Sequence, residues 1–217
     1  MTKLHFGCGQ NYLKGYLNVD YPLSEHTVQE SSVADLYANI TKLSYKKGEV
    51  AEIRLHHVFE HFQKLQASAM LASWNYWLNE DGIVRIEVPD LSALSLVFLN
   101  PFSNFKAKAV AERHLFGSHE ASWASHYAGY NLQLLDLLFK QFGFQIFKVK
   151  KTKWKGIYNI DVSAKKIFSI KSKNDALQLA EIYLKNFLVD NTPGELKILD
   201  IWIQGFKKQL SQSCSIR

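Results

Sequence analysis

The sequence predicts an α/β fold built on a mainly parallel sheet with helices on both faces. Short apolar runs alternate with stretches of helical spacing, two glycines follow the first apolar run, and an acid ends the second. In open sheets of this kind, ligands bind at the carboxyl ends of the strands, where such a glycine turn and acid would lie.

The expected strands are short and bounded by turn signals. "KLHFG" is expected to be the first strand, ending in the turn "GCG", and "YLNVD" the second, ending at Asp20. "AEIRLHH" alternates between apolar and polar residues as a further strand would, and "IVRIEVPDL" is expected to be a strand that ends at Pro89. Later, "QIFKVKK" and "YNIDVSAKKIFSI" alternate and are expected to pair with each other.

Helices are expected between and after these strands. "QKLQASAMLASWNYWL" has helical spacing and should stop at "NEDG", whereas "NLQLLDLLFKQFGF" should be an amphipathic helix with Asn131 as its cap and Gly143 as its stop. Beyond residue 173, "NDALQLAEIYLKNFLVD" and "GELKILDIWIQGFKKQL" are expected to be two helices split by "NTPG". We expect their apolar faces to dock on the core, the alternative being a homodimer interface.

Residues 92–130 show no clear periodicity and are rich in aromatic residues and histidines. A segment of this length without periodicity is typical of a lid or a substrate-binding insertion. We therefore divide the chain into a first domain over residues 1–172, which carries this insertion, and a C-terminal helical appendage over residues 173–217.

The composition, 47% hydrophobic and 21% charged residues, is that of a globular protein. The two cysteines, Cys8 and Cys214, form no spacing motif, which argues against a disulfide framework and indicates a reducing compartment. The apolar stretches are too short for a membrane span, and the strand pattern begins too early for a signal peptide. We therefore expect a cytoplasmic protein.

The net charge of +6 is concentrated in residues 140–173, which hold ten lysines and one acid. We interpret this segment as a solvated lysine face on edge strands, where lysine opposes aggregation. The alternative is a basic face that attracts phosphate, nucleic acid or an anionic membrane surface.

The pairing of "LHFGCGQ" with "NVD" is the most informative feature of the chain. Gly7 and Gly9 would let the backbone approach a ligand more closely than a Cβ allows. Asp20, at the end of the second strand, is placed to accept hydrogen bonds from ribose hydroxyls.

Five segments in order, "KLHFGCGQNYLKGYLNVD", "ANITKL", "AEIRLHHVFEHF", "NEDGIVRIEVPDL" and "YAGYNLQLLDLLFKQFGF", resemble the class I S-adenosylmethionine-dependent methyltransferases. The resemblance spans about residues 3–170 and is greatest to a small bacterial group often linked to glycan biosynthesis. It implies a Rossmann-like fold, with a mainly parallel seven-stranded sheet and an antiparallel last strand. It also implies S-adenosylmethionine as the cofactor and residues 1–172 as the methyltransferase domain.

The resemblance further implies a set of cofactor-binding residues: Phe6, Gly7, Cys8, Gly9, Asp20, Asn39, Ile40, His56 and His57. The glycine turn would wrap the methionine end and Asp20 would hold the ribose. Asn39 and the residue after it would lie beside the adenine, and the two histidines near the sulfonium.

Two departures from the family pattern bear on this site. Only ten residues separate Gly9 from Asp20, so the first helix is shortened or lost. Asn39 stands where the family usually has a carboxylate; its amide oxygen can still accept from the adenine amino group, but more weakly.

The stretch "RLHHVFEHF" contains His57-x-x-Glu60-His61, the pattern of inverted zinc peptidases. A zinc site of this kind needs His57 and His61 on one helical turn and a third protein ligand. However, "AEIRLH" is expected to run directly into His57 as a strand. The methyltransferase group has a similar sequence at this place. We therefore expect no metal, with Glu60 and His61 pairing with each other or with backbone at the start of a helix.

Methyl transfer mostly needs alignment of the reacting atoms, and a sugar hydroxyl must also lose its proton. His126 is the first candidate for the base, followed by His57 and Asp90; Asp90 could instead cap the next helix. Trp123, within the expected insertion over residues 92–130, could stack on a sugar ring or belong to the core of a lid.

The predicted function is methyl transfer to a hydroxyl of a sugar, a glycan precursor or another small molecule. The alternative is a degenerate fold that acts as a non-catalytic binding module. Nucleic acid is disfavoured as a partner, because "HHVF" stands where amino-methylating enzymes carry an Asn/Asp-Pro-Pro-aromatic motif. RNA methylation and zinc-dependent hydrolysis are therefore less favoured.

Overall fold

The computed structural model describes residues 1–26, 30–154 and 156–213. Cys214 and Lys155, which is one of the ten lysines counted in residues 140–173, lie outside the described residues, as does the end of the C-terminal appendage. The described strands form one seven-stranded sheet in the order β3-β2-β1-β4-β5-β7-β6. Their bounds are β1 Thr2–Phe6, β2 Leu17–Asp20, β3 Leu36–Tyr37, β4 Val50–His56, β5 Leu78–Pro89, β6 Phe144–Trp154 and β7 Ile157–Lys166.

The strand directions match the predicted fold class. Neighbouring strands from β3 to β5 pair in parallel, whereas β7 runs antiparallel to both β5 and β6. The sheet is therefore mainly parallel with an antiparallel last strand. The prediction of a Rossmann-like α/β fold is confirmed.

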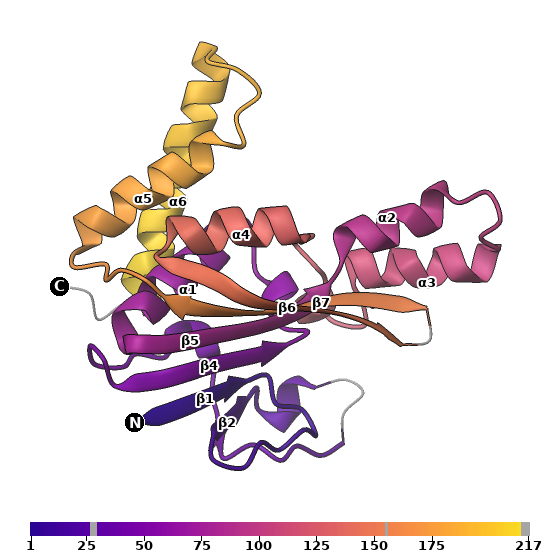
Figure 1. The fold of residues 1–217 in the computed structure, drawn as a ribbon, viewed down its shortest axis with the longest axis horizontal. Coiled ribbons are helices and arrows are strands. Elements are labelled where there is room, and N and C mark those ends of the chain that lie inside the picture. The colour runs from indigo at the N-terminus through magenta and orange to yellow at the C-terminus, as the bar shows by residue number, and fades with distance from the viewer. Residues whose placement is uncertain (27–29, 155, 214–217) are drawn as a thin grey trace.

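The helices are mostly those that the sequence predicts, with bounds α1 Lys64–Trp77, α2 Leu91–Leu99, α3 Phe105–Phe116, α4 Leu132–Gln141, α5 Lys173–Lys185 and α6 Pro193–Ser213. Asn131 caps α4 by accepting a hydrogen bond from the Leu134 amide at 2.9 Å, and Gly143 follows the helix with a φ of 85°. α6 packs along α1, with α5 beside it (Figure 1). Phe206 of α6 is fully buried in the common core, so these helices dock as predicted.

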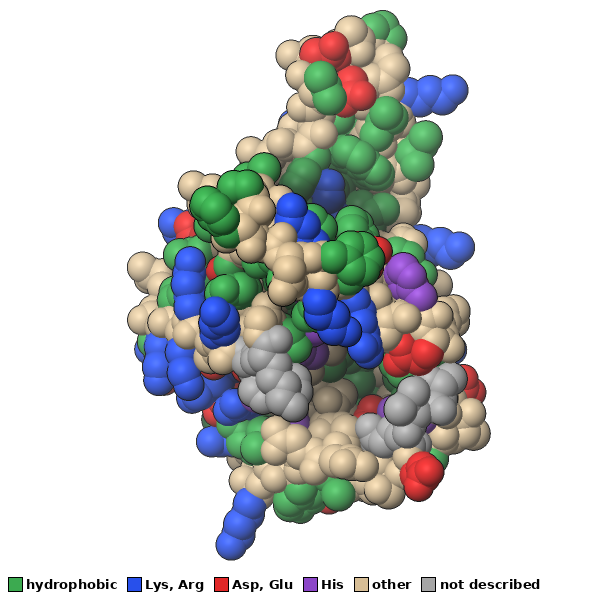
Figure 2. Space-filling model, turned by 90° about the vertical axis from the view of Figure 1, so that its right-hand side faces the viewer, with side chains coloured by type: hydrophobic (Ala, Val, Ile, Leu, Met, Phe, Trp, Pro, Cys, Tyr) green, Lys and Arg blue, Asp and Glu red, His purple; other side chains and the backbone are tan. Residues whose placement is uncertain are grey.

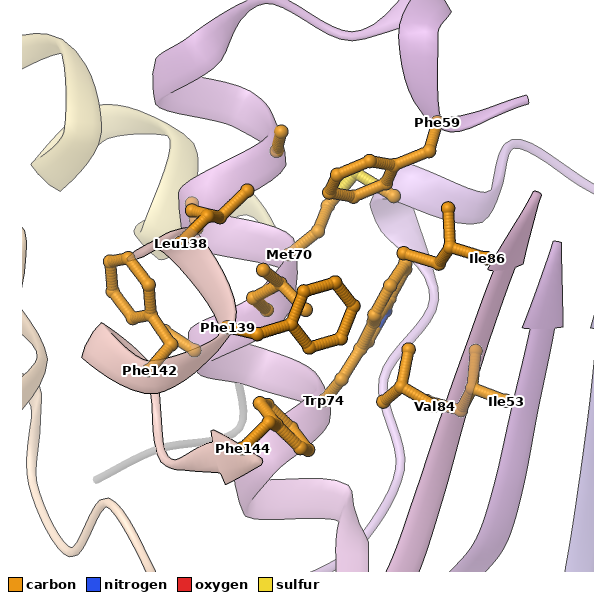
Figure 3. Packing of buried hydrophobic residues seen from close by; sticks show 14 of the residues in the cluster. Ile53, Phe59, Met70, Trp74, Val84, Ile86, Leu138, Phe139, Phe142 and Phe144 are labelled. Carbon is orange, nitrogen blue, oxygen red and sulfur yellow. The ribbon is translucent and has the colours of Figure 1, made fainter. Parts of the chain in front are cut away.

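The core lies between the sheet and helices α1 and α4. Trp74 of α1 is fully buried against Ile53, Val84 and Ile86 of the sheet on one side and Phe139 of α4 on the other (Figure 3). Each large apolar side chain buried in this way stabilises the fold by roughly 1.5–3 kcal/mol.

The expectation of helices on both faces is wrong for the described part of the chain. The opposite face, called the polar face below, lies open in Figure 1 without an α-helix across it. It presents polar side chains from alternate strand positions: His5, Asn18, Glu52, Arg54, His56, Arg85, Glu87, Asn159, Asp161 and Ser163. Right-handed crossovers from β1 to β2 and from β2 to β3 would place helices there. In the described residues, however, these connections hold turns and the 3₁₀ helix Leu23–Glu25 only.

One local expectation also needs correction. Residues 92–130 are not irregular, because α2 and α3 form a helical hairpin within them, followed by a 3₁₀ helix over Ser122–Ala124. The predicted helix stop at "NEDG" agrees with the structure, since α1 ends at Trp77 and β5 begins at once with Leu78. Val50 of β4 pairs with Leu78 of β5, but Glu52 pairs with Ile83, so "NEDG" forms a bulge in β5.

None of the helices in the described residues combines the length and the apolar character needed to cross a bilayer.

Candidate functional site

A cleft of about 760 Å³ opens where β1, β2 and β4 end at their carboxyl edges. Figure 2 views the molecule from this side and shows a hollow with histidine side chains inside it and Lys and Arg side chains gathered beside it. The volume lies within the roughly 300–1,000 Å³ typical of small-molecule and cofactor sites. The parallel topology therefore places the cleft where ligands of open sheets bind.

Seven of the predicted cofactor-binding residues line this cleft: Gly7, Gly9, Asp20, Asn39, Ile40, His56 and His57. The structure does not bring the side chains of Phe6 and Cys8 to it. Phe6 is fully buried in the core, because it alternates with His5 on β1 and faces α1. Cys8 is buried with its Sγ 4.0 Å from Asp20 Oδ2, and burial raises the pKa of its thiol to about 11.

The glycine turn is positioned by the strand beside it. Gly7 has a φ of 66°, and a Cβ there would lie 2.2 Å from Val58 Cγ2, so only glycine fits. The Gly9 amide, with a φ of 54°, donates to Asp20 Oδ2 at 2.8 Å, while the Tyr21 amide donates to Asp20 Oδ1 at 2.8 Å. A carboxylate offers about four acceptor sites, so Asp20 can still accept from a ligand.

Asn39 is engaged differently from the expectation. Its Oδ1 accepts from the Thr41 amide at 2.9 Å and from the Thr41 hydroxyl at 2.7 Å. An amide oxygen has two lone pairs, and Thr41 uses both. Asn39 therefore offers a ligand the hydrogens of its amide group rather than its oxygen, and the expected acceptance from an adenine amino group is corrected.

The two histidines at the end of β4 point to different surroundings. His56 accepts at Nε2 from Arg54 at 2.9 Å and has its Nδ1 4.0 Å from Glu87, so its ring lies on the polar face. His57 has a left-handed φ of 53°, which is uncommon for a residue with a Cβ and is often found at functional sites. Burial lowers the pKa of His57, but Glu60, with Oε1 at 3.3 Å from Nδ1, outweighs it and raises this pKa above its ordinary value.

The H-x-x-E-H stretch does not form the helical turn that the peptidase pattern needs. His57 follows the strand, His61 belongs to the 3₁₀ helix Phe59–His61, and α1 begins only at Lys64. His61 Nδ1 lies 3.1 Å from the Ser125 carbonyl oxygen, and the Tyr127 amide donates to the Glu60 carbonyl oxygen at 2.9 Å. The stretch therefore holds the far end of the insertion against the cleft.

The His126 ring makes an edge-to-face contact with the His61 ring, with 4.7 Å between the ring centroids. Its Nδ1 is 2.9 Å from the His114 carbonyl oxygen, and burial lowers its pKa. His61 lines the cleft and His126 does not.

Asp90 is 2% exposed and caps α2, since its Oδ1 accepts from the amides of Ser92 and Ala93 at 3.1 and 3.3 Å. It does not line the cleft either. The capping role considered for Asp90 is thus the one seen.

No pattern in the sequence indicated that the insertion reaches over to the second strand. Trp123 Nε1 donates to the Glu25 carbonyl oxygen at 2.8 Å, and its ring lies edge-on to His26 with centroids 5.9 Å apart. Trp123, Glu25 and His26 line the cleft, as does Glu120. Because 98 positions separate Trp123 from Glu25, no local spacing could have predicted the contact.

No family model and no curated protein matches this sequence. Solved structures do match in fold. A protein from Listeria monocytogenes, assigned as an S-adenosylmethionine-dependent methyltransferase, has a TM-score of 0.51 and 12% identity, over 77% of this chain and 91% of that chain. The 1,6-didemethyltoxoflavin-N1-methyltransferase of Burkholderia thailandensis, with S-adenosylhomocysteine bound, has a TM-score of 0.50 and 13% identity, over 77% and 71%.

A third match is in the complex between the Trm112 methyltransferase activator of Haloferax volcanii and a protein assigned as a methyltransferase, with a TM-score of 0.53 and 10% identity, over 78% of this chain and 83% of that chain. At such low identities, the likeness concerns the fold. The strand order with its antiparallel last strand agrees with it. This chain therefore has the fold found in S-adenosylmethionine-dependent methyltransferases.

Proposed function

We propose that this protein is an enzyme that transfers a methyl group from S-adenosylmethionine to a hydroxyl of a sugar, a glycan precursor or another small molecule. The observation that carries the proposal is the cleft in which left-handed glycines, Gly7 and Gly9, meet the strand-end carboxylate Asp20. The S-adenosylhomocysteine bound to the Burkholderia thailandensis enzyme, which shares the fold, supports the choice of cofactor.

In this proposal, each side of the cleft offers the cofactor a different kind of contact. The glycine turn lets the backbone approach the methionine end, and Asp20 accepts from the ribose hydroxyls. Ile40 supplies an apolar contact for the adenine, and the Asn39 amide hydrogens suit an adenine ring nitrogen. His57 would lie on the sulfonium side of the site.

A hydroxyl acceptor must lose its proton, and His126 is our first candidate for the base. Burial keeps its imidazole neutral near pH 7, as a base requires. The His114 carbonyl oxygen can only accept, so His126 Nδ1 carries the hydrogen and Nε2 has the free lone pair. His57, whose Nδ1 lies 3.3 Å from Glu60 Oε1, is the second candidate, and Asp90, engaged as a helix cap, is the third.

The non-catalytic binding module remains the second candidate function. It is favoured by the engaged oxygen of Asn39 and by the absence of an α-helix between β1 and β2. We further propose a cytoplasmic protein with a small-molecule or glycan acceptor rather than nucleic acid. The exposed side chains of Ile182, Leu196 and Ile201 on α5 and α6 support a homodimer through these helices.

Calorimetry with S-adenosylhomocysteine tests the cofactor site. The wild-type protein should bind it, and Asp20→Ala should weaken binding at least tenfold, or about 1.4 kcal/mol, because the ribose loses its acceptor. Asp136→Ala, on the exposed side of α4, is the matched control and should bind as the wild type does. If the wild type shows no binding, the methyltransferase function is wrong and the binding module is favoured.

Turnover of His126→Ala tests the base, after a screen of sugars and nucleotide-sugars with labelled cofactor has identified an acceptor. The substitution should lower turnover by roughly 10²–10⁴ while cofactor affinity stays nearly constant. The control is His119→Asn in the same insertion, since asparagine tolerates the left-handed φ of 59° at that position. Turnover within a factor of about three of the wild type would exclude His126, because a general base contributes far more.

A further inference from the structure

Three potential metal ligands meet beside the cleft: Glu60, His61 and His126. One ligand atom of each lies within 4.8 Å of the other two. Glu60 and His61 come from the 3₁₀ helix after β4, and His126 comes from the end of the insertion, 65 positions further along the chain. These two segments are held together by the Tyr127 and Ala128 amides, which donate to the Glu60 carbonyl oxygen, and by the contact of His61 Nδ1 with the Ser125 carbonyl oxygen.

The Glu60 carboxylate is almost completely buried without the donors that such a group needs. The residue is 1% exposed, and neither Oε1 nor Oε2 accepts a hydrogen bond from the described part of the chain. Its close contact is the 3.3 Å approach of His57 Nδ1, which does not have hydrogen-bond geometry. The half-exposed imidazole of His57 lies beside Oε1 alone, and the buried Oε2 has no partner in the described residues. Burying a carboxylate with so little compensation is costly, so the site calls for a further positive charge next to Glu60.

The two histidines are oriented as metal-binding histidines usually are. His61 Nδ1 lies 3.1 Å from the Ser125 carbonyl oxygen, and His126 Nδ1 lies 2.9 Å from the His114 carbonyl oxygen. A carbonyl oxygen only accepts, so each Nδ1 carries the hydrogen and each Nε2 has a free lone pair. Carbonyl partners of this kind fix the ring and the tautomer of histidines in metal sites.

We propose that the Glu60 carboxylate and the Nε2 atoms of His61 and His126 bind one divalent first-row transition-metal ion at the wall of the cleft. Two imidazoles and a carboxylate suit ions from Mn²⁺ to Zn²⁺, whereas Mg²⁺ and Ca²⁺ prefer sites made of oxygen ligands. With three protein ligands, the ion keeps an open position, as in catalytic metal sites. His61 lines the cleft, so the ion can be reached from it.

This proposal departs from the expectation of no metal drawn from the sequence. That expectation considered His57 and His61 on one helical turn, and this pair is not the one that the fold assembles. The third ligand is His126, which lies next to Glu60 and His61 only in the folded chain.

The ion would also change the assignment of the base, a consequence that rests on the proposed function. With its Nε2 on the ion, His126 could not accept a proton, and His57 would be the base. A hydroxyl or water held at the open position would lose its proton more readily. Binding of the ion itself does not depend on methyl transfer.

The test is metal binding by the full chain, purified without a His tag and stripped with a chelator. Titration with Co²⁺, followed by its visible absorption, and with Zn²⁺, followed by calorimetry, should each saturate at one ion per chain. A millimolar excess of Mg²⁺ should leave both titrations unchanged. Bound Zn²⁺ should raise the melting temperature, because it binds the folded chain preferentially.

Glu60→Gln keeps the shape of the side chain and removes its charge, and His126→Ala removes one imidazole. Each should weaken Co²⁺ and Zn²⁺ binding at least tenfold, whereas His119→Asn should bind as the wild type does. The proposal is overturned if the wild type binds neither ion saturably, or if folded His126→Ala binds them unchanged. Should Glu60→Gln fail to fold, the wild type and His126→Ala still decide the matter. Since none of these readouts uses S-adenosylmethionine, failure here is distinct from failure of the proposed methyl transfer.

Discussion

Two rows of residues cross the sheet one position apart and face opposite sides. One row runs through Val19, Phe6, Leu55, Ile86 and Val162 and meets the helices. The next row runs through Asn18, His5, Arg54, Arg85 and Ser163 and belongs to the polar face. The same strands thus support a packed apolar core on one side and a layer of polar contacts on the other.

On the polar face, contacts between polar side chains take the place of packing against helices. Its charged groups satisfy one another: Arg85 Nε lies 2.7 Å from Glu52 Oε1, and Lys3 Nζ lies 3.5 Å from Glu52 Oε2. Glu87 Oε1 accepts from Thr152 at 3.3 Å, and the His5 ring lies 3.0 Å from the Asn18 amide oxygen. Glu52, His5 and Asn18 are buried in these contacts, whereas Lys3 and Arg85 are partly exposed. The polar face therefore gains from paired polar groups, whereas the apolar core contributes most of the stability.

The largest expected effect is a difference in stability between substitutions of Ile86 and Glu87, which are neighbours on β5 and face opposite sides of the sheet. Ile86→Ala should lower the free energy of unfolding by about 2–5 kcal/mol, because it opens a cavity under Trp74. Glu87→Ala, on the polar face, should cost about 1 kcal/mol or less. Urea denaturation of both variants measures the difference. Equal losses would mean that the polar face contributes to stability as the core does.

A second matched pair lies on β7, where Lys166 faces the helices and Lys165 the solvent. Lys166 is 6% exposed and donates to the carbonyl oxygens of Asn75 and Leu78, at the end of α1. Lys165 pairs with the exposed Asp81 at 2.9 Å.

Lys166→Met should therefore cost about 1–3 kcal/mol, because buried carbonyl groups lose their donor. Lys165→Met should lower the free energy of unfolding by about 1 kcal/mol or less, because exposed ion pairs contribute no more than that. Chemical denaturation of both variants provides the measurement, and a smaller loss in Lys166→Met than in Lys165→Met would contradict the assignment of the two faces.

The sequence already contained the signal for an open face. "AEIRLHH" and "IVRIEVP" alternate strictly, as strands with one solvated face do, whereas strands covered on both faces read as continuous apolar runs. The regular alternation of strands and helices led to the opposite expectation. The ten residues between β1 and β2 are close to the shortest crossover that can hold a helix, about 10–12 residues, and here they hold none.

The strand ends of the site were predictable because they depend on local signals. Gly7, Gly9 and Asp20 are placed by turn chemistry and by the edge at which parallel strands end. The contacts of Trp123 with Glu25 and of His126 with His61 connect distant segments. They depend on how the α2–α3 hairpin folds back, and "LSALSLVFL" is too uniformly apolar to show which side of α2 would be buried.

The smallest expected effect is a pH dependence that arises on the polar face. Burial lowers the pKa of His5, and burial together with the positive charge of Arg54 lowers that of His56. Below the ordinary histidine pKa of about 6.5, the unfolded chain takes up protons at these positions that the folded chain resists. Stability should therefore fall as the pH drops from 7 through 6.5, and the stabilisation is present above that value.

Two other histidines contribute to the same range, so a variant is needed to isolate the polar face. The lowered pKa of His126 acts in the same direction, whereas the raised pKa of His57 adds stability below 6.5 that is lost as the pH rises through the folded value. His5→Gln removes one titrating group from the polar face and leaves those two in place. Its urea midpoint should change less between pH 7.5 and about 5.5 than that of the wild type, because one source of proton uptake on unfolding is gone. A slope as steep as that of the wild type would show that His5 does not resist protonation in the folded chain. The polar face would then be open enough to water to hold a charged imidazole.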